Sequence, residues 1–143
     1  RRPLPATDAD RNQILDVLTD LSFASGQDLQ PKFKYLIAVL RWLTGDEAGG
    51  INGFRQLARD TEYVEGKRVL PRNVITNEEM EPIKFTGVVE RRIGDQRWSV
   101  HVRELNRKVD LVEGRWIQDV SIGKELPSFA IAFNYLGPIA VRL

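Results

Sequence analysis

Residues able to do acid–base or metal chemistry are scarce in this chain of 143 residues. His101 is its single histidine, and the chain has no cysteine. A zinc site needs several imidazole or thiolate ligands, which this composition does not supply. No serine stands in a G-x-S-x-G turn, and no second imidazole could activate one as a nucleophile. We therefore predict that the protein is not an enzyme and binds no metal, cofactor or small-molecule substrate. We expect His101 to be a surface or hydrogen-bonded strand residue.

Two pairs of acidic residues are the remaining candidates for a cation site. Asp8 lies close to Asp10, and Glu78 is followed directly by Glu79. Neighbouring acids in a loop or at the start of a helix are more often solvated, or stabilised by the helix dipole, than bound to a hard cation. Glycoside hydrolysis needs two carboxylates at a defined separation, which neither pair specifies. We interpret both pairs as surface groups.

Basic residues are better candidates for binding. The formal net charge is only +1, so any attraction for a polyanion has to be local. Segment 91–108 keeps a local excess of cations near Trp98 and Trp116, whereas acids are mixed among the other basic residues. Such a surface could contact phosphates or anionic headgroups, at about 1 kcal/mol for each basic residue near a membrane. The alternative is an ordinary solvated surface. The basic clusters are Arg1/Arg2, Lys32/Lys34, Lys67/Arg68/Arg72, Arg91/Arg92/Arg97 and Arg103/Arg107/Lys108.

The composition is that of a folded domain that needs neither metal nor disulfide. Hydrophobic residues make up 42% and charged residues 29% of the 143 residues, a length that suits one domain. No stretch approaches the roughly 20 apolar residues that span a bilayer, and segment 1–5 lacks the apolar core of a signal peptide. The lack of cysteine fits a reducing compartment. Because the chain begins with Arg1, we expect a fragment or a processed product.

Helical periodicity dominates the first part of the chain. Asp8 or Asp10 can cap a first helix over about 10–22, one apolar stripe of which should be buried. Pro31 suits the first turn of a second helix. A third, short helix should run over about 51–60, after a break extended by Gly49 and Gly50. The apolar residues at helical spacing are Ile14, Val17, Leu18 and Leu21, then Phe33, Leu36, Ile37, Leu40 and Leu43, then Ile51, Phe54, Leu57 and Ala58.

The periodicity stops in segment 62–82 and resumes with the two-residue period of β-strands. Glycine, proline and asparagine interrupt that segment, and a loop this long in a compact domain is usually functional or mobile. Beyond it, alternation of apolar and polar residues predicts strands joined by tight turns, the last of them an edge strand. The run 129–133 is apolar on both faces, so it lies in the core or meets another subunit. The expected strands are 84–93, 97–104, 108–112, 115–122, 129–133 and 138–143.

These patterns predict an α+β fold in a single domain. Two to three N-terminal helices, in a helical half over 1–61, pack on a C-terminal antiparallel sheet or meander over 83–143. The long loop 62–82 joins the two halves.

In this order of elements the chain resembles the folded core of a rhabdovirus matrix protein. An Arg2-Pro3 segment precedes an amphipathic helix, and KFKYLIAVL (32–40) runs into WLTG (42–45). After a small helix come the polar segment EYVEGKRVLP (62–71), the acidic TNEE (76–79) and the strand FTGV (85–88). The resemblance covers most of the chain.

The resemblance implies a non-enzymatic structural protein of the virion that self-associates and bridges the inner membrane leaflet and the nucleocapsid. Its partners would be other copies of itself, an anionic membrane surface, and nucleocapsid protein or RNA. Its location would be the virion, the host cytoplasm and the inner face of the membrane. The expected membrane or nucleic-acid contacts are Arg1, Arg2, Lys32, Lys34, Arg91, Arg92 and Arg97. The expected self-association residues are Glu62, Tyr63, Val69, Leu70, Pro71, Val74 and Ile75.

Two other functions stay open. The segment ILDVLTDLSFASG (14–26) has the texture of a helical effector-recruiting module, so the chain could be a cytoplasmic bacterial adaptor that binds a protein partner. An adaptor should stay monomeric or dimeric, whereas a matrix protein should form large, salt-sensitive assemblies. An enzyme that uses the sheet and His101 ranks last, and full activity after His101→Ala would remove its only base.

Overall fold

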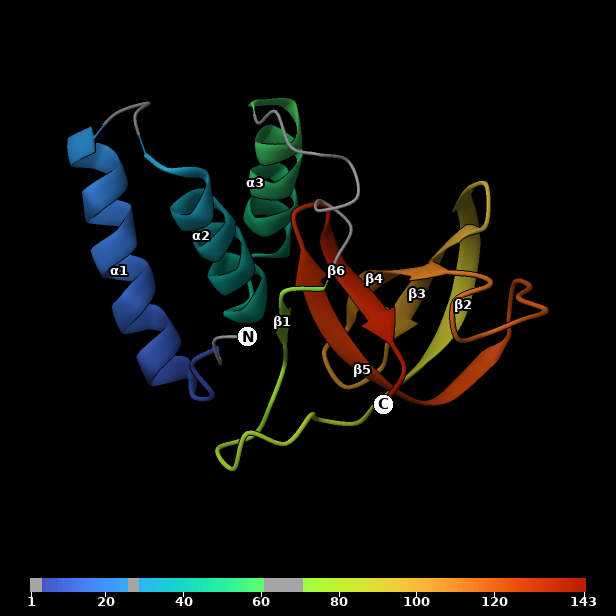
Figure 1. Ribbon diagram of the computed structural model, residues 1–143. Coiled ribbons are helices and arrows are strands. Elements are labelled where there is room, and N and C mark those ends of the chain that lie inside the picture. Colours follow the sequence, from blue (N-terminus) through green and yellow to red (C-terminus); the bar gives the residue numbers. More distant parts are fainter. Residues whose placement is uncertain (1–3, 26–28, 61–70) are drawn as a thin grey trace. The chain divides into compact units, whose positions relative to one another are not determined.

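The computed structural model describes residues 4–25, 29–60 and 71–143 (Figure 1). These residues divide into two compact units. Helices come first along the chain and a mostly antiparallel sheet follows, so the α+β fold class is confirmed. The single domain stays a prediction. The helical unit comprises residues 5–25, 29–60 and 134–137, and the sheet unit comprises Leu4, 71–133 and 138–143.

Helix α1 (Asp8–Ser25) extends beyond the predicted 10–22 at both ends. Thr7 is its N-cap, because the Thr7 hydroxyl oxygen accepts a hydrogen bond from the backbone N–H of Asp10 at 3.2 Å. Asp8 and Asp10 both lie in the first turn, where their negative charge is favoured by the helix dipole. The prediction that one of these aspartates forms the cap is therefore wrong.

The apolar stripe predicted to be buried on α1 is mostly exposed. Leu18 is buried in a cluster with residues of the second helix, and Leu15 packs against that cluster. Ile14, Val17 and Leu21 are 37%, 62% and 41% exposed. The physical reason is that α1 packs along one neighbouring helix, which covers a face narrower than the apolar residues occupy.

Helix α2 (Pro31–Leu43) begins at Pro31, as predicted, and ends at Leu43, the last of its predicted apolar residues. It lies between α1 and α3 (Glu47–Asp60) (Figure 1). Pro31 stands at the start of α2, where its missing N–H costs nothing. Most of α2 is buried, in keeping with its central place. The buried residues of α2 are Tyr35, Ile37, Ala38, Val39, Leu40, Trp42 and Leu43.

Helix α3 begins at Glu47, earlier than the predicted Ile51, because Asp46 caps it. The Asp46 carboxylate accepts a hydrogen bond from the Gly49 N–H at 2.9 Å. The glycines predicted to extend the break instead lie inside the helix. A Cβ at Gly50 would stand 2.8 Å from the Trp42 Cβ, so glycine here permits the close approach of α3 to α2.

The strands form one sheet that closes on itself. β2, β3 and β4 are an antiparallel meander. β5 pairs with β1, β2 and β6, and β6 also pairs in parallel with β4. The sixth strand is thus paired on both sides, and the prediction that it forms a sheet edge is wrong. The strands are β1 (Asn73–Val74), β2 (Phe85–Gly94), β3 (Arg97–Val102), β4 (Arg107–Val112), β5 (Glu125–Asn134) and β6 (Gly137–Val141).

Two predictions about the sheet unit are wrong. The described end of segment 62–82 is not a loop throughout, because Asn73 and Val74 pair with β5 and Thr76 bridges to Pro82. Segment 115–122 is not a strand. The Gly114 N–H donates to the Ile117 carbonyl at 2.9 Å, which bends the chain back at the start of this segment.

The apolar run 129–133 lies in the core, as the first of its two predicted uses required. All of these residues are buried, with Phe129, Ile131 and Phe133 at 0% exposure. The strand begins earlier than expected, at Glu125, and contains Pro127. Proline is tolerated there because the pairing of β5 with β2 shifts its register beside it.

Candidate functional site

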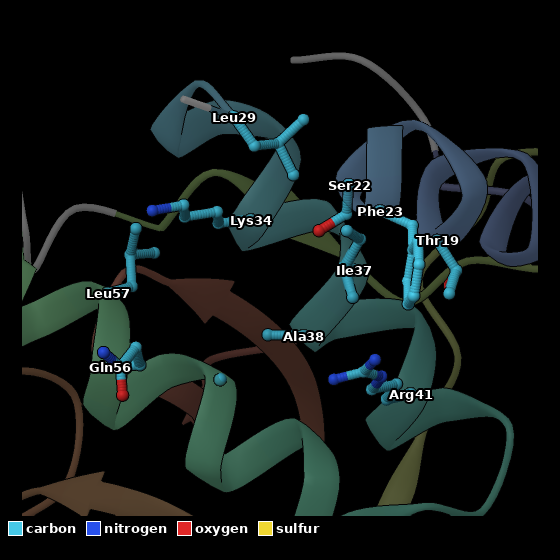
Figure 2. A pocket seen from close by; sticks show the side chains of 11 residues that line it. Thr19, Ser22, Phe23, Leu29, Lys34, Ile37, Ala38, Arg41, Gln56 and Leu57 are labelled. Carbon is cyan, nitrogen blue, oxygen red and sulfur yellow. The ribbon is translucent and has the colours of Figure 1, made fainter. Parts of the chain in front are cut away.

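A groove crosses the helical unit over α2, between α1 and α3 (Figure 2). Its volume is ≈ 470 Å³, within the range of binding clefts. Each helix contributes residues from one of its faces, and Leu29 adds a side chain just before α2. The described lining residues are Thr19, Ser22 and Phe23 of α1, Leu29, then Lys34, Ile37, Ala38 and Arg41 of α2, and Gly53, Gln56 and Leu57 of α3.

Helical spacing explains why these residues face one space. Thr19, Ser22 and Phe23 stand at i, i+3 and i+4, a spacing that places side chains on one face of α1. The lining residues of α2 and α3 follow the same rule, with positions 34, 37, 38 and 41 on α2 and 53, 56 and 57 on α3. Three neighbouring helical faces therefore form one continuous surface.

The floor of the groove is apolar and well packed. Leu57 is 0%, Ala38 1% and Ile37 7% exposed, and Ile37 also belongs to the cluster that joins α1 to α2. Gly53 keeps α3 close to α2, because a Cβ there would stand 2.9 Å from the Ala38 Cβ. Figure 2 shows Ile37 and Ala38 of α2 between the side chains of α1 and those of α3. The floor is thus part of the core of the unit and is fixed in place.

Phe23 lines the groove yet is 92% exposed. An aromatic side chain of this size contributes little to folding when it is so accessible. It can bury a large area when a partner covers it, which is why aromatic residues are common among the side chains that dominate binding energy. Phe23 is therefore the residue of the groove with the most apolar surface to offer a ligand.

The charge of the groove is positive. Lys34 and Arg41 are its charged residues among those described, and none of the described lining side chains is a carboxylate. Seven positions separate them on α2, which corresponds to two turns and about 10.5 Å along the axis. Within the described chain neither side chain forms an ion pair. The groove can therefore bind an apolar group flanked by negative charge.

The neutral polar groups of the rim are partly engaged by the protein itself. The Thr19 hydroxyl donates to the Leu15 carbonyl at 2.7 Å, within its own helix. Gln56 accepts a hydrogen bond from Arg59 at 3.3 Å. Ser22 is half-buried. The described lining presents hydroxyl, amide and cationic groups around the apolar floor, which is a set suited to binding an anionic group.

The cations predicted to contact a membrane or nucleic acid fall in both units. Arg1 and Arg2 lie outside the described residues. Lys32 is exposed at the start of α2, with its Nζ 5.1 Å from the centroid of the Phe33 ring, whereas Lys34 lines the groove. The structure does not bring Lys32 to the groove. The remaining three, Arg91, Arg92 and Arg97, belong to β2 and β3.

Acidic neighbours balance most cations of the β2–β3 hairpin and of the residues that follow it. Arg92 Nη2 lies 3.3 Å from an Asp95 oxygen, and Arg97 Nη2 lies 3.0 Å from an Asp110 oxygen. Arg103 is paired with Glu125, and Lys108 Nζ lies 3.5 Å from Glu90. Arg91 is exposed and forms no ion pair with the described residues. These ion pairs therefore neutralise part of the positive charge that the sequence concentrates in segment 91–108.

His101 lies on β3 and is partly exposed. Its Nδ1 stands 3.6 Å from the Glu90 carboxylate, which Lys108 also approaches. These contacts fit the prediction of a surface or hydrogen-bonded strand residue. Ser99, two residues away on the same face of β3, is 5% exposed, so that face is not uniformly solvated.

Two carboxyl groups of the sheet unit have shifted pKa values. Burial raises the pKa of the Asp110 carboxyl, although the Arg97 guanidinium at 3.0 Å acts to lower it. Burial also acts to raise the pKa of Glu104. There the Thr86 backbone N–H and hydroxyl, which donate to the carboxylate at 2.8 and 2.7 Å, outweigh burial and the pKa is lowered. Both shifts follow from structural contacts.

Most of the residues predicted for self-association lie outside the part of the chain that the structure describes. Glu62, Tyr63, Val69 and Leu70 lie outside the described residues. Pro71 and Val74 are half-buried, and Val74 pairs with Ala132 of β5. Ile75 is 3% exposed, and its N–H donates to the Ile131 carbonyl at 2.9 Å. Ile75 therefore belongs to the core of the sheet unit.

The acidic pairs lie at the surface, as predicted. Glu78 and Glu79 are exposed in a turn in which the Asn77 side-chain oxygen accepts from the N–H groups of Glu79 and Glu81. Within the described ranges, no three His, Asp or Glu side chains come together as ligands for a metal ion. None of the described helices is long and apolar enough to cross a membrane.

Of the residues that line the groove, Lys34 alone was among the binding residues predicted from the sequence. The signal for α2 was available, because Lys34, Ile37, Ala38 and Arg41 stand at i, i+3, i+4 and i+7, with cations at the ends and apolar residues between them. Phe23 had no such signal, since it lies off the apolar stripe of its helix. Only the packing of α1 beside α2 brings it to the groove.

The chain matches no known family model, and comparisons with curated proteins and with solved structures find none that is similar.

Proposed function

We propose that the chain is a non-enzymatic protein-interaction module whose helical unit binds an apolar, negatively charged segment of a partner protein. The observation that carries this proposal is the groove over α2: an apolar floor, Phe23 exposed at its side, and Lys34 and Arg41 two turns apart without ion pairs in the described chain. This is the adaptor function among those that the sequence left open.

An amphipathic helix is the occupant that these features suit best. Helix-in-groove recognition uses apolar anchors at i, i+3, i+4 and i+7, a length that matches the two turns between Lys34 and Arg41. Each buried anchor contributes about 1.5–3 kcal/mol before the cost of ordering is subtracted. Carboxylates beside the anchors would meet the two cations and select against basic helices.

The test uses a synthetic amphipathic helix with a leucine stripe and flanking glutamates, and a second peptide in which lysines replace the glutamates. Fluorescence anisotropy should show binding of the acidic peptide and weak or no binding of the basic one. The double variant K34E/R41E should reverse this preference. The variant K32E/R55E is the matched control, because it makes the same change of charge on α2 and α3 at exposed residues outside the groove. Equal binding of both peptides to the wild type would contradict the proposal.

A matrix-like structural role is the second candidate. The observation that favours it is the end of β2, where Arg91 and Arg92 are exposed next to Ile93, itself 42% exposed. Cations beside an exposed aliphatic residue suit contact with anionic headgroups. The ion pairs of the hairpin lower its positive electrostatic potential, which argues against a strong attraction for anionic partners. The variant R91E/R92E should lower binding to anionic liposomes and to RNA, and unchanged binding to both would rule out this role for the hairpin.

A further inference from the structure

The outer face of α1 carries apolar residues that nothing in the described chain covers fully. We name Ile14, Val17 and Leu21 the α1 stripe. They stand at i, i+3 and i+7 and are 37%, 62% and 41% exposed. At 100° per residue, this stripe lies on the side of α1 opposite Thr19 and Phe23, which line the groove. One helix therefore presents two separate surfaces.

The two surfaces are complementary in charge and in length. Helix α1 contains four aspartates and one arginine, and Asp10 and Asp20 lie beside the stripe. The groove contributes Lys34 and Arg41 and, among its described lining, no carboxylate. Ile14 and Leu21 are separated by two turns, about 10.5 Å, as are Lys34 and Arg41. The stripe thus has the apolar anchors and flanking acids that the groove is suited to bind.

We propose that the occupant of the groove is a second copy of this chain, which inserts its α1 stripe. This inference rests on the proposed function, because it names the partner of the same groove. A symmetric contact of stripe against stripe is disfavoured, since it would bring Asp10 and Asp20 of one copy against the same acids of the other. The contact is therefore heterologous: a stripe meets a groove.

When two copies meet by a heterologous contact, one stripe and one groove remain free. Stripe and groove lie on opposite sides of α1, so a copy whose groove is filled still offers its stripe to the next. Such head-to-tail contacts continue into an open chain, or close into a ring when the rotation between copies permits. The association should weaken as salt rises, because carboxylates and cations meet at the rim of the contact.

Two variants test the inference by complementation. V17S/L21S removes two apolar anchors of the stripe without adding charge, and K34E/R41E places carboxylates in the groove. Val17 and Leu21 are exposed, and Lys34 and Arg41 are half-buried on the wall of the groove, so circular dichroism and thermal unfolding should show both variants to be folded. In sedimentation experiments the wild type should grow beyond the dimer as concentration rises, and each variant alone should stay monomeric. An equimolar mixture should form a dimer and nothing larger, because it contains one intact groove and one intact stripe.

The outcomes separate this inference from the proposed function. A mixture without dimers, or a K34E/R41E variant that still associates alone, would overturn the head-to-tail contact. If the wild type stays monomeric while the groove still binds the acidic probe helix, the second copy is the wrong partner and the interaction module stands. If the probe helix also fails to bind, both proposals fail. The control K32E/R55E should associate like the wild type.

Discussion

Phe23→Ala separates the binding of a partner from the stability of the fold. A phenylalanine buries about 200 Å² when it is fully covered, and at 92% exposure almost all of this area is available to a ligand. If a docked helix covers about half of it, about 100 Å² at about 25 cal/mol per Å² stabilises the complex by about 2.5 kcal/mol. Ordering the side chain on binding costs about 0.5–1.5 kcal/mol. The net loss in the variant is then about 1–2 kcal/mol, or about 5–30-fold in Kd.

Fluorescence anisotropy with the acidic probe helix measures this loss, and chemical unfolding measures stability. Phe23→Ala should change the free energy of unfolding by less than about 0.5 kcal/mol, because an exposed side chain contributes little to folding. Ile122→Ala is the matched control, since Ile122 is 70% exposed in the sheet unit and lies outside the groove. It should change neither quantity. An unchanged Kd in Phe23→Ala would refute this role of Phe23. So would a loss of about 3–5 kcal/mol in the free energy of unfolding, which is the cost expected when a packed phenylalanine is truncated to alanine.

Three further predictions concern the scaffold of the two units. Asp46→Ala should destabilise the helical unit by about 0.5–2 kcal/mol in urea unfolding, because it removes the cap that accepts from Gly49; no change would mean that another group caps α3. Leu57→Ala should cost about 2–5 kcal/mol, because Leu57 is 0% exposed beneath the groove, and a cost near zero would contradict a packed floor. Glu104→Gln should destabilise at neutral pH by about 0.5–1 kcal/mol, since the Thr86 bonds to an exposed carboxylate are partly screened. Because the pKa of Glu104 is lowered in the fold, its carboxylate stabilises the protein above the ordinary pKa range of glutamate, and this stabilisation is lost as pH falls below that range. The variant and the wild type should therefore have the same free energy of unfolding in acid. A difference that persists there would contradict this assignment.

Local patterns predicted the elements well where local chemistry decides them. Pro31 and the apolar spacing that follows set the bounds of α2, which the structure matches. The two-residue alternation likewise predicted β2, β3 and β4 to within a few residues. Gly49 and Gly50 show the limit of this reasoning, because glycine in isolation indicates a break. Here the Asp46 cap and the close approach of α3 to α2 place both glycines inside a helix.

Tertiary contacts decided the rest. The apolar residues of α1 correctly indicated a helix but not its buried face, which depends on how many neighbours the helix has. Segment 115–122 alternates like a strand, yet the Trp116 indole N–H donates to the Ala140 carbonyl at 3.3 Å and the chain turns instead. The groove is a further case: Lys34 and Arg41 can be read from one helix, whereas Phe23 and Leu57 join them only when three helices are assembled.

Backbone amide chemical shifts in an NMR titration test most directly whether the groove over α2 binds a protein segment. Addition of the acidic probe helix to the wild type should move amide signals of α1 near Phe23, of α2 between Lys34 and Arg41, and of α3 near Gln56. The signals of β2, β3 and β4 should stay in place. Shifts confined to those strands, or no shifts at saturating peptide, would contradict a protein-binding groove in the helical unit.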